Sequence, residues 1–388
     1  MEYIKVKDLF TIKKGKKVEQ LEQTDGTIRC IQIDDLRNNE NLKYCKKDTR
    51  YVYSKIDDII IAWDGANAGT IGYRLNGAIG STLAVLRKNN DDFDTEYCGL
   101  FLKSKFNYLR DNCTGATIPH ISRNALEELN IPKFELTIQK KIVESINLAQ
   151  ELIDKRKEQI EALDELVKSK FIEMFGNPIN NPKGWEVKKL KSLSTKIHSG
   201  NTPKGGSEVY VDEGIMFFRS QNVWKNKLIL DDIAYINQET HNKMLKSSLK
   251  NRDILMTKTG RINTENSSLG RAAMFFGKDD SANVNGHVYL IRLKEGIVNE
   301  FILYILTSKE YRGYIRSVCV GGIDKRQLNK EHIEDFPIIF PPVESQKEFV
   351  RYVKQVDKLK FEMESSLKEL EDNFNALMQR AFKGELFK

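Results

Sequence analysis

Two long stretches of the chain repeat apolar residues at the spacing of a coiled coil. Residues 137–174 contain neither Gly nor Pro, and apolar or tolerant positions recur there in alternating steps of four and three. Residues 345–382, which follow Pro341-Pro342, repeat the pattern more cleanly. A 3.5-residue spacing sustained over about five heptads predicts coiled-coil helices, each about 57 Å long at 1.5 Å per residue. Ser345 and Glu348 have the spacing of a capping box and predict where the second helix begins.

Short runs of β-branched and aromatic residues fill most of the remaining sequence, and Gly- and Asn-rich turns separate them. Such runs predict strands. The clearest runs are residues 28–33, 59–63, 83–86, 215–218 and 288–293, and residues 97–107 and 299–308 are predicted as short helices. The predicted fold class is α+β, with mixed, mostly β globular parts and two long helices.

The two halves of the sequence contain the same unit in the same order. The segment Asp58-Ile59-Ile60-Ile61 matches Asp253-Ile254-Leu255-Met256, residues 3–9 match 185–190, and residues 121–126 match 323–328. Each copy ends in one of the long helices, so we expect a pseudo-two-fold repeat in which the helices pair antiparallel and the globular units lie at opposite ends. The predicted divisions are residues 1–135, 136–175, 176–340 and 341–388, with a turn-rich linker at 175–185.

Charge and cysteine content narrow the class of protein. The chain has 62 Lys and Arg against 55 Asp and Glu, a net charge of +7, which is consistent with a nucleic-acid partner without requiring one. The longest apolar run, residues 59–63, is far shorter than a spanning helix, so we expect a cytoplasmic protein without a membrane segment. Five scattered cysteines without a CxxC spacing predict buried free thiols and no zinc knuckle or disulfide framework.

The sequence contains no recognisable active site. It lacks a Gly-rich cofactor loop, a Pro-Pro-aromatic motif for a flipped base and a phosphate-binding GxxxxGK[ST] loop. Its five histidines form no i,i+4 pair, so no metal site is predicted. Acidic pairs such as Asp34-Asp35 and Asp279-Asp280 are typical of turns.

Several phrases resemble the specificity subunit of type I restriction-modification enzymes over essentially the whole chain. They are DIIIAWDGANAGTIG (58–72), DILMTKTG (253–260), IPKFELTIQKKIV (131–143), IIFPPVESQKEFV (338–350), FIEMFGNP (171–178) and QRAFKGELF (379–387). The resemblance implies two target recognition domains, each reading one half of a bipartite site in double-stranded DNA, and helices that set the distance between the half-sites. It also implies a chain without catalysis that binds two methyltransferase subunits and, for cleavage, two restriction (translocase) subunits. S-adenosylmethionine, ATP and Mg²⁺ are then expected in those partner subunits.

Candidate DNA contacts fall in four pairs of loops. Lysines around a glycine suit phosphates, whereas Arg matches guanine and Gln or Asn matches adenine. The candidates are Lys13, Lys14, Lys16 and Lys17 with His198, Asn201, Thr202 and Lys204; Gln32 with Arg219, Gln221 and Asn222; Asn67 with Lys258, Arg261 and Asn263; and His120 with Lys325 and Arg326.

Each of these loops has an alternative interpretation as a solvated or structural turn. One departure from the repeat bears on this choice, because Trp63-Asp64 stands where the second copy has Lys258-Thr259. An acidic residue there argues against a direct phosphate contact by the first copy's loop.

The alternative for the whole chain is a non-enzymatic coiled-coil scaffold with two protein-binding heads, which salt-dependent binding to duplex DNA would exclude.

Overall fold

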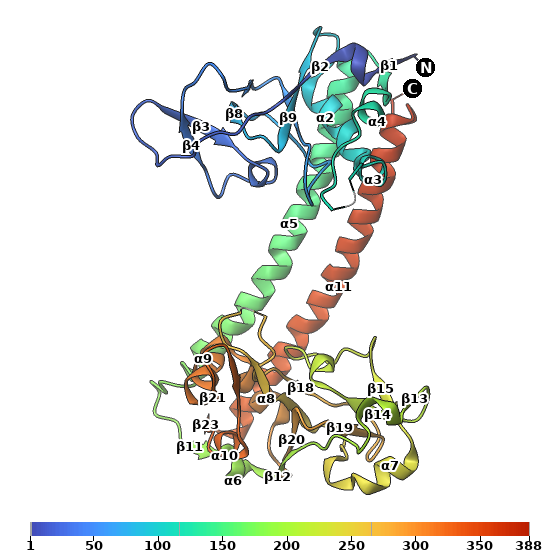
Figure 1. Ribbon diagram of the computed structural model, residues 1–388. Coiled ribbons are helices and arrows are strands. Elements are labelled where there is room, and N and C mark those ends of the chain that lie inside the picture. Colours follow the sequence, from blue (N-terminus) through green and yellow to red (C-terminus); the bar gives the residue numbers. More distant parts are fainter. Residues whose placement is uncertain (1, 116, 265, 388) are drawn as a thin grey trace. The chain divides into compact units, whose positions relative to one another are not determined.

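The computed structural model describes residues 2–115, 117–264 and 266–387, and its chain forms two compact units. Unit 1 comprises Met1–Gln159 with Met363–Lys388, and unit 2 comprises Ile160–Glu362. The two long helices, α5 (Leu136–Phe175) and α11 (Val343–Phe382), each contribute residues to both units (Figure 1). No helix in the described part of the chain is both long and apolar enough to cross a bilayer.

The remaining elements of each unit are short. Unit 1 contains β1 (Glu2–Lys5), α1 (Val6–Leu9), β2 (Phe10–Lys14), β3 (Thr27–Ile31), β4 (Tyr44–Lys46), β5 (Tyr53–Ser54), β6 (Ile59–Ala62), β7 (Ile71–Tyr73), β8 (Gly77–Ile79), β9 (Leu83–Lys88), α2 (Thr95–Ser104), α3 (Phe106–Asp111), α4 (Arg123–Glu127) and β10 (Asn130–Lys133). Unit 2 contains β11 (Val187–Lys189), α6 (Leu190–Leu193), β12 (Ser194–Ser199), β13 (Tyr210–Val211), β14 (Ile215–Phe218), β15 (Ala234–Ile236), α7 (Gln238–Lys243), β16 (Ile254–Thr257), β17 (Thr259–Arg261), β18 (Ala272–Met274), β19 (Ala282–Val284), β20 (Val288–Leu293), α8 (Asn299–Thr307), α9 (Lys309–Val318), β21 (Val320–Gly321), β22 (Lys325–Gln327), α10 (Lys330–Glu334) and β23 (Pro337–Ile339).

Two sheets have the same strand order in both units, and another four-stranded sheet differs between the units at one edge strand. The sheet β2-β9-β6-β7 corresponds to β12-β20-β16-β18, and β1-β10 corresponds to β11-β23. The other four-stranded sheets share the order β4-β3-β8 and β15-β14-β19 and differ in the fourth strand, because β5 lies beside β8 whereas β13 lies beside β15. Both second sheets contain one parallel pair, β3 with β8 and β14 with β19. The predicted repeat and the predicted α+β fold with two sheet-rich domains are therefore confirmed.

A buried ion pair occupies the same place in both copies. Asp58 and Asp253, which are 2% and 1% exposed, lie just before β6 and β16. Arg87 of β9 donates to Asp58 through Nε and Nη2 at 2.9 and 2.6 Å, and Arg292 of β20 donates to Asp253 at 2.9 and 2.7 Å. A buried carboxylate is stable only with such partners, so this pair explains why the Asp-Ile motif appears twice in the sequence.

In unit 1, the first turns of α5 pack against the last turns of α11. Ile142 shares an apolar core with Met378 and Phe382. The Phe382 ring also contacts Tyr97 and Phe101 of α2, with ring centroids 5.5 and 5.4 Å apart. The end of α11 is therefore part of the core of unit 1 rather than an appendage.

In unit 2, the opposite ends of the same helices meet. Phe175 at the end of α5 packs edge-on against Phe349 near the start of α11 and against Phe301 of α8, with ring centroids 5.8 and 5.1 Å apart. Burying aromatic side chains contributes about 1.5–3 kcal/mol each, well above the contribution of exposed ion pairs. Apolar packing therefore provides most of the stability at these helix ends.

Ion pairs along the two helices have the antiparallel order that the repeat predicted. Lys157 lies 2.9 Å from Glu371 within unit 1. Lys360 lies 2.6 Å from Asp164 within unit 2. Residues later in α5 thus face residues earlier in α11.

The predicted start of the second helix is wrong by two residues. Helix α11 begins at Val343, directly after the two prolines, so Ser345 lies inside its first turn and does not cap it. The buried Gln346 instead donates from Nε2 to the Pro341 carbonyl at 2.7 Å. The two prolines set the start because proline fits the first turn of a helix but not its interior.

The cysteines are free thiols, as their spacing predicted. Cys30, Cys45, Cys98 and Cys319 are buried, whereas Cys113 is partly exposed. The prediction of buried thiols is therefore confirmed for four of the five.

Candidate nucleic-acid interface

The lysine-rich turn of unit 1 depends on a glycine. The amide of Gly15 donates to the Leu83 carbonyl at 2.8 Å, and a Cβ at position 15 would lie 2.2 Å from the Gly80 carbonyl oxygen. Only glycine permits this approach. The four lysines on either side of it, Lys13, Lys14, Lys16 and Lys17, are exposed.

Asp64 connects two of the predicted loops in unit 1. Its carboxylate lies 2.7 Å from Lys14 Nζ and 2.6 Å from His120 Nδ1. Burial raises the pKa of Asp64, but the hydrogen bonds from Lys14 and His120 lower that pKa by more, so the carboxylate is ionised. Asp64 therefore already bonds two predicted DNA contacts, whereas no ion pair joins Lys13, Lys16 or Lys17 to another described residue.

The two loops are also joined through their backbones. The Gly65 amide donates to the Pro119 carbonyl at 2.8 Å, and Asp64 and Thr114 each form a bridge with His120. Asn67 accepts a hydrogen bond from Arg37, a residue that the sequence did not indicate, at 2.5 Å. Ala116, within the second of these predicted loops, lies outside the described residues.

The corresponding turn of unit 2 is built in the same way. Gly200 donates to the Val288 carbonyl at 2.9 Å, and a Cβ there would lie 2.1 Å from the Val284 carbonyl oxygen. The residues after it, Asn201, Thr202 and Lys204, are exposed, whereas His198 is half-buried. Burial and the charge of Lys196 lower the pKa of His198, so its ring is neutral at pH 7.

Strand pairing brings four predicted residues of unit 2 together. In the pairing of β17 with β22, Arg261 faces Lys325 and Gly260 faces Arg326. The Leu328 amide donates to the Lys258 carbonyl at 2.9 Å, which extends the contact beyond the strands. Arg261 Nε lies 3.2 Å from Asp324, and Asn263 follows in an exposed loop. Lys258, Arg261, Lys325 and Arg326 thus form one basic edge.

Arg219 and Gln221 share a partner that the sequence did not indicate. Arg219 donates to the side chain of Asp232 at 2.9 Å and also to its carbonyl, and Gln221 donates to the other carboxylate oxygen at 2.9 Å. The bonds from Gln221 and Arg219 lower the pKa of Asp232. The side chain of Asp232 is 72% exposed and that of Arg219 is 20% exposed, so the exposed group of this cluster is the carboxylate.

Asn222 stabilises the turn and does not face solvent. It is 1% exposed, its Oδ1 accepts the Arg219 amide at 2.9 Å, and its Nδ2 donates to the Ile229 carbonyl at 3.1 Å. In unit 1 the Gln32 amide donates in the same way to Asp35 at 2.7 Å. The sequence prediction of Asn222 as a base-contacting residue is therefore not supported by its position, because its amide is already fully used.

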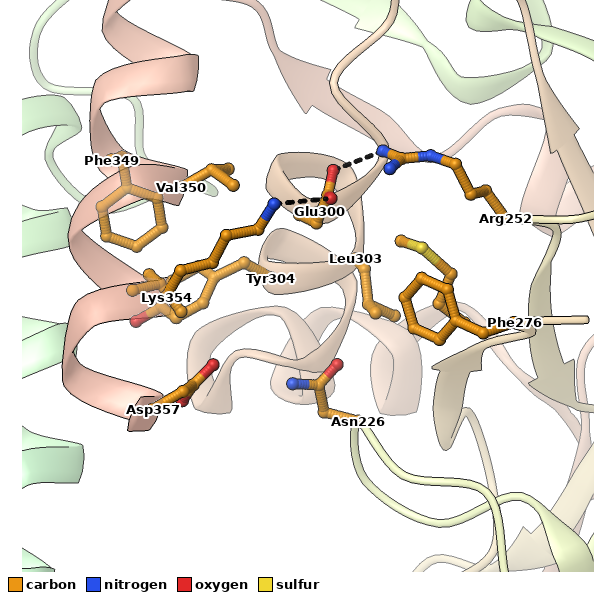
Figure 2. A pocket seen from close by; sticks show the side chains of 12 residues that line it. Asn226, Arg252, Phe276, Glu300, Leu303, Tyr304, Phe349, Val350, Lys354 and Asp357 are labelled. Atoms are coloured by element: carbon orange, nitrogen blue, oxygen red, sulfur yellow. Dashed lines mark hydrogen bonds and ion pairs between the residues drawn. The ribbon is translucent and has the colours of Figure 1, made fainter. Parts of the chain in front are cut away.

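A separate cavity of about 390 Å³ lies in unit 2 where α8 meets α11. Its lining is mainly apolar and includes Phe276, which is 69% exposed. Figure 2 shows Glu300 between two cations, Arg252 at 2.6 Å and Lys354 at 3.6 Å. Asp357 lies at the rim, and no ion pair joins it to another described residue.

The surroundings of Asp357 predict that the stability of unit 2 depends on pH. Burial raises the pKa of Asp357, with Lys360 opposing and Asp164 adding to the increase. The folded state therefore binds this proton more tightly than the unfolded state, so stability falls as pH rises above about 4. Asp357→Asn is expected to raise the melting temperature at pH 7 and to have little effect near pH 3. Thermal unfolding followed by circular dichroism tests this, with Glu362→Gln on the exposed face of α11 as the control; equal shifts for the two variants would contradict it.

The sequence matches a known protein family and several of its characterised members. The profile of the type I restriction modification DNA specificity domain matches residues 1–162 and 182–372. The chain is 25% identical over 373 residues to the type I restriction enzyme MjaVIII specificity subunit of Methanocaldococcus jannaschii, covering 92% of this chain and 86% of that protein. It is 22% identical over 408 residues to the EcoKI specificity subunit of Escherichia coli K12, covering 97% and 86%.

Solved structures share the fold. A chain from a type I R-M system, studied for its complex assembly and conformational transition, superposes with a TM-score of 0.66 at 18% identity and covers 99% of this chain and 98% of its own. The S subunit from M. genitalium superposes with a TM-score of 0.52 at 16% identity, covering 98% and 95%. The duplicated domain with paired helices is thus the architecture of DNA specificity proteins. The chain belongs to the type I restriction-modification DNA specificity family.

Proposed function

We propose that this chain selects the DNA sites of a type I restriction-modification system by reading an asymmetric, bipartite sequence, one half-site per unit. The observation that carries the proposal is that the two units share a sheet and a buried ion pair but differ in their predicted DNA-binding loops. Both units have the same Asp–Arg pair in a sheet of the same strand order, yet Lys13, Lys14, Lys16 and Lys17 in one correspond to His198, Asn201, Thr202 and Lys204 in the other. Because the loops differ while the supporting sheet is shared, the two units are expected to read two different half-sites.

The proposed interface of each unit consists of its predicted loops. In unit 1 it comprises the lysines of the turn, Gln32, Asn67 and His120. In unit 2 it comprises Asn201, Thr202, Lys204, Arg219, Gln221, Lys258, Arg261, Asn263, Lys325 and Arg326, with His198 and Asn222 as supporting residues. Lysines and arginines supply affinity through phosphates, and the polar residues near them supply the base contacts.

In this proposal the chain itself performs no catalysis. It carries two adenine methyltransferase subunits and, for cleavage, two restriction subunits, and S-adenosylmethionine, ATP and Mg²⁺ bind to those partners. The family match supports the assignment to such a complex. The scaffold alternative receives no support from the same match.

Salt-dependent binding and reconstituted activity test the proposal together. The chain assembled with methyltransferase subunits is expected to bind duplex DNA with an affinity that falls roughly 10³-fold between about 50 and 200 mM salt. The purified chain alone is expected to show neither methylation nor cleavage with any cofactor. Fluorescence anisotropy and incorporation of labelled methyl groups measure both. Turnover by the isolated chain, or binding without salt dependence, would refute the proposal.

A further inference from the structure

Helix α9 and the loop after β17 line an open, basic cavity of about 890 Å³ in unit 2. The loop residues Asn263 and Thr264 form one wall. The cationic lining residues are Lys225, Lys309, Arg312 and Arg316, and none of the described lining residues is acidic. Arg312 and Arg316 are one helical turn apart, so both project from the same face of α9.

Arg312 is the least satisfied of these cations. It is half-buried, and its guanidinium forms no hydrogen bond or ion pair within the described chain. Burial and the neighbouring Arg316 both lower its pKa, which shows that the site disfavours its charge. Positive charges that are desolvated without a counterion raise the free energy of the folded state, and a bound anion lowers it.

A further arginine near Arg312, Arg271, does not line the cavity and is held by other groups. Arg271 stacks on the Trp224 ring, 3.8 Å from its centroid, and donates from Nε to the Ser267 carbonyl at 3.0 Å. Burial and the nearby charge of Arg312 both lower the pKa of Arg271. Arg312 thus interacts unfavourably with the charges of two other arginines, Arg316 and Arg271.

We propose that this cavity binds a phosphate of the DNA backbone, held by Arg312 and Arg316. The inference rests on the proposed function, because Asn263 in the cavity wall belongs to the loop assigned to DNA and follows Arg261 of the basic edge. Guanidinium groups bind phosphate oxygens through charge-assisted, often bidentate hydrogen bonds. Such a contact strengthens binding to any sequence and fixes how unit 2 is positioned on the duplex.

The first copy replaces the central residues of this cavity. A Cβ at Gly69 would meet Phe106 and Leu109, and a Cβ at Gly270 would meet Ile315, so the two glycines lie against the corresponding helices and the segments align with Leu109 at the position of Ile315. At the aligned positions, Thr70 replaces Arg271 and Phe106 replaces Arg312, and only Arg110 retains the charge of Arg316. Arg110 donates to the Ala66 carbonyl at 2.6 Å, much as Arg316 donates to Thr264 at 3.4 Å. The phosphate contact is therefore expected on the side of unit 2.

The test uses the chain assembled with its methyltransferase subunits. Arg312→Gln is expected to weaken binding to the recognised duplex and to a scrambled duplex by the same factor, about tenfold. The slope of log affinity against log salt should become shallower by about 1, the value for one lost phosphate contact. Arg312→Lys should retain most of the affinity. Lys294→Gln, at an exposed position after β20, makes the same charge change outside the cavity and should alter neither quantity.

Further measurements separate the alternatives. Arg312→Gln should melt at the same temperature as the parent or higher, because it relieves repulsion, so lost affinity cannot be attributed to misfolding. Unchanged affinity and slope in a complex that still binds DNA would overturn this inference and leave the proposed function standing. Loss of subunit assembly instead, or stabilisation by inorganic phosphate that Arg312→Gln abolishes while DNA binding is unchanged, would also overturn it. Absence of salt-dependent binding in the parent complex would overturn the proposed function itself.

Discussion

Matched insertions of four residues, between Gln159 and Ile160 of α5 and between Glu362 and Met363 of α11, should move methylation from every original site to sites with a longer spacer. Both helices connect the two units, and each unit pairs one end of α5 with the opposite end of α11. Four residues add about one helical turn, roughly 6 Å. Duplex DNA rises about 3.4 Å per base pair, so the spacer should grow by one or two base pairs while both half-sites stay unchanged.

Methylome sequencing of a strain carrying the variant measures this directly. A four-residue insertion between Asn180 and Asn181, in the linker after α5, is the control, because it lengthens the chain without lengthening a helix. An insertion in α5 alone should reduce activity, because it shifts one helix against the other and disrupts the shared cores. Full activity with an unchanged spacer in the double insertion would show that the helices do not determine it.

Arg219→Ala should abolish or alter recognition of one half-site and leave the other intact. Arg219 and Gln221 both donate to Asp232, so removing the arginine leaves Gln221 as the remaining side-chain donor to this carboxylate. A good bidentate contact to a base contributes about 1–3 kcal/mol of discrimination, which corresponds to roughly a 5- to 150-fold loss. Asp232→Ala should affect the same half-site, because it removes the shared partner.

The matched change in unit 1 is Gln32→Ala, since Gln32 occupies the position of Arg219 in the repeat. It should affect the other half-site only. Methylation of a plasmid library with randomised half-sites resolves the two effects. If Arg219→Ala and Gln32→Ala changed the same half-site, or if neither changed any, these positions would not be the base-contacting ones.

The long helices and several strands could be predicted because their signals are local. The heptad pattern of residues 137–174 became α5, Leu136–Phe175, and the runs at 215–218 and 288–293 became β14 and β20 with identical bounds. The start of α11 was misplaced because Ser345 and Glu348 have capping spacing but Pro341-Pro342 sets the boundary first. Where two local signals disagree, the prolines determine the start of the helix, because their fixed backbone angle and missing N–H exclude them from its interior.

The electrostatic partners of the candidate site could not be predicted in this way. Asp64 pairs with Lys14 and His120, which lie far from it in the sequence and meet it only through the fold. Asp232 binds Arg219 and Gln221 across a loop whose path no periodicity specifies. The repeat did identify which loops correspond, but only the fold showed which side chains are already paired.

The division of the chain also determines the order in which its parts can be completed during synthesis. Unit 1 needs residues from both chain ends, because Phe382 closes the core over Tyr97 and Phe101, whereas unit 2 is one continuous segment. A ribosome delivers the N-terminal part first, yet that part lacks its last core residues until α11 has emerged. Unit 2 can therefore finish folding before unit 1. A product that terminates before Phe382 would expose the aromatic surface of α2 and become a substrate for chaperones and proteases.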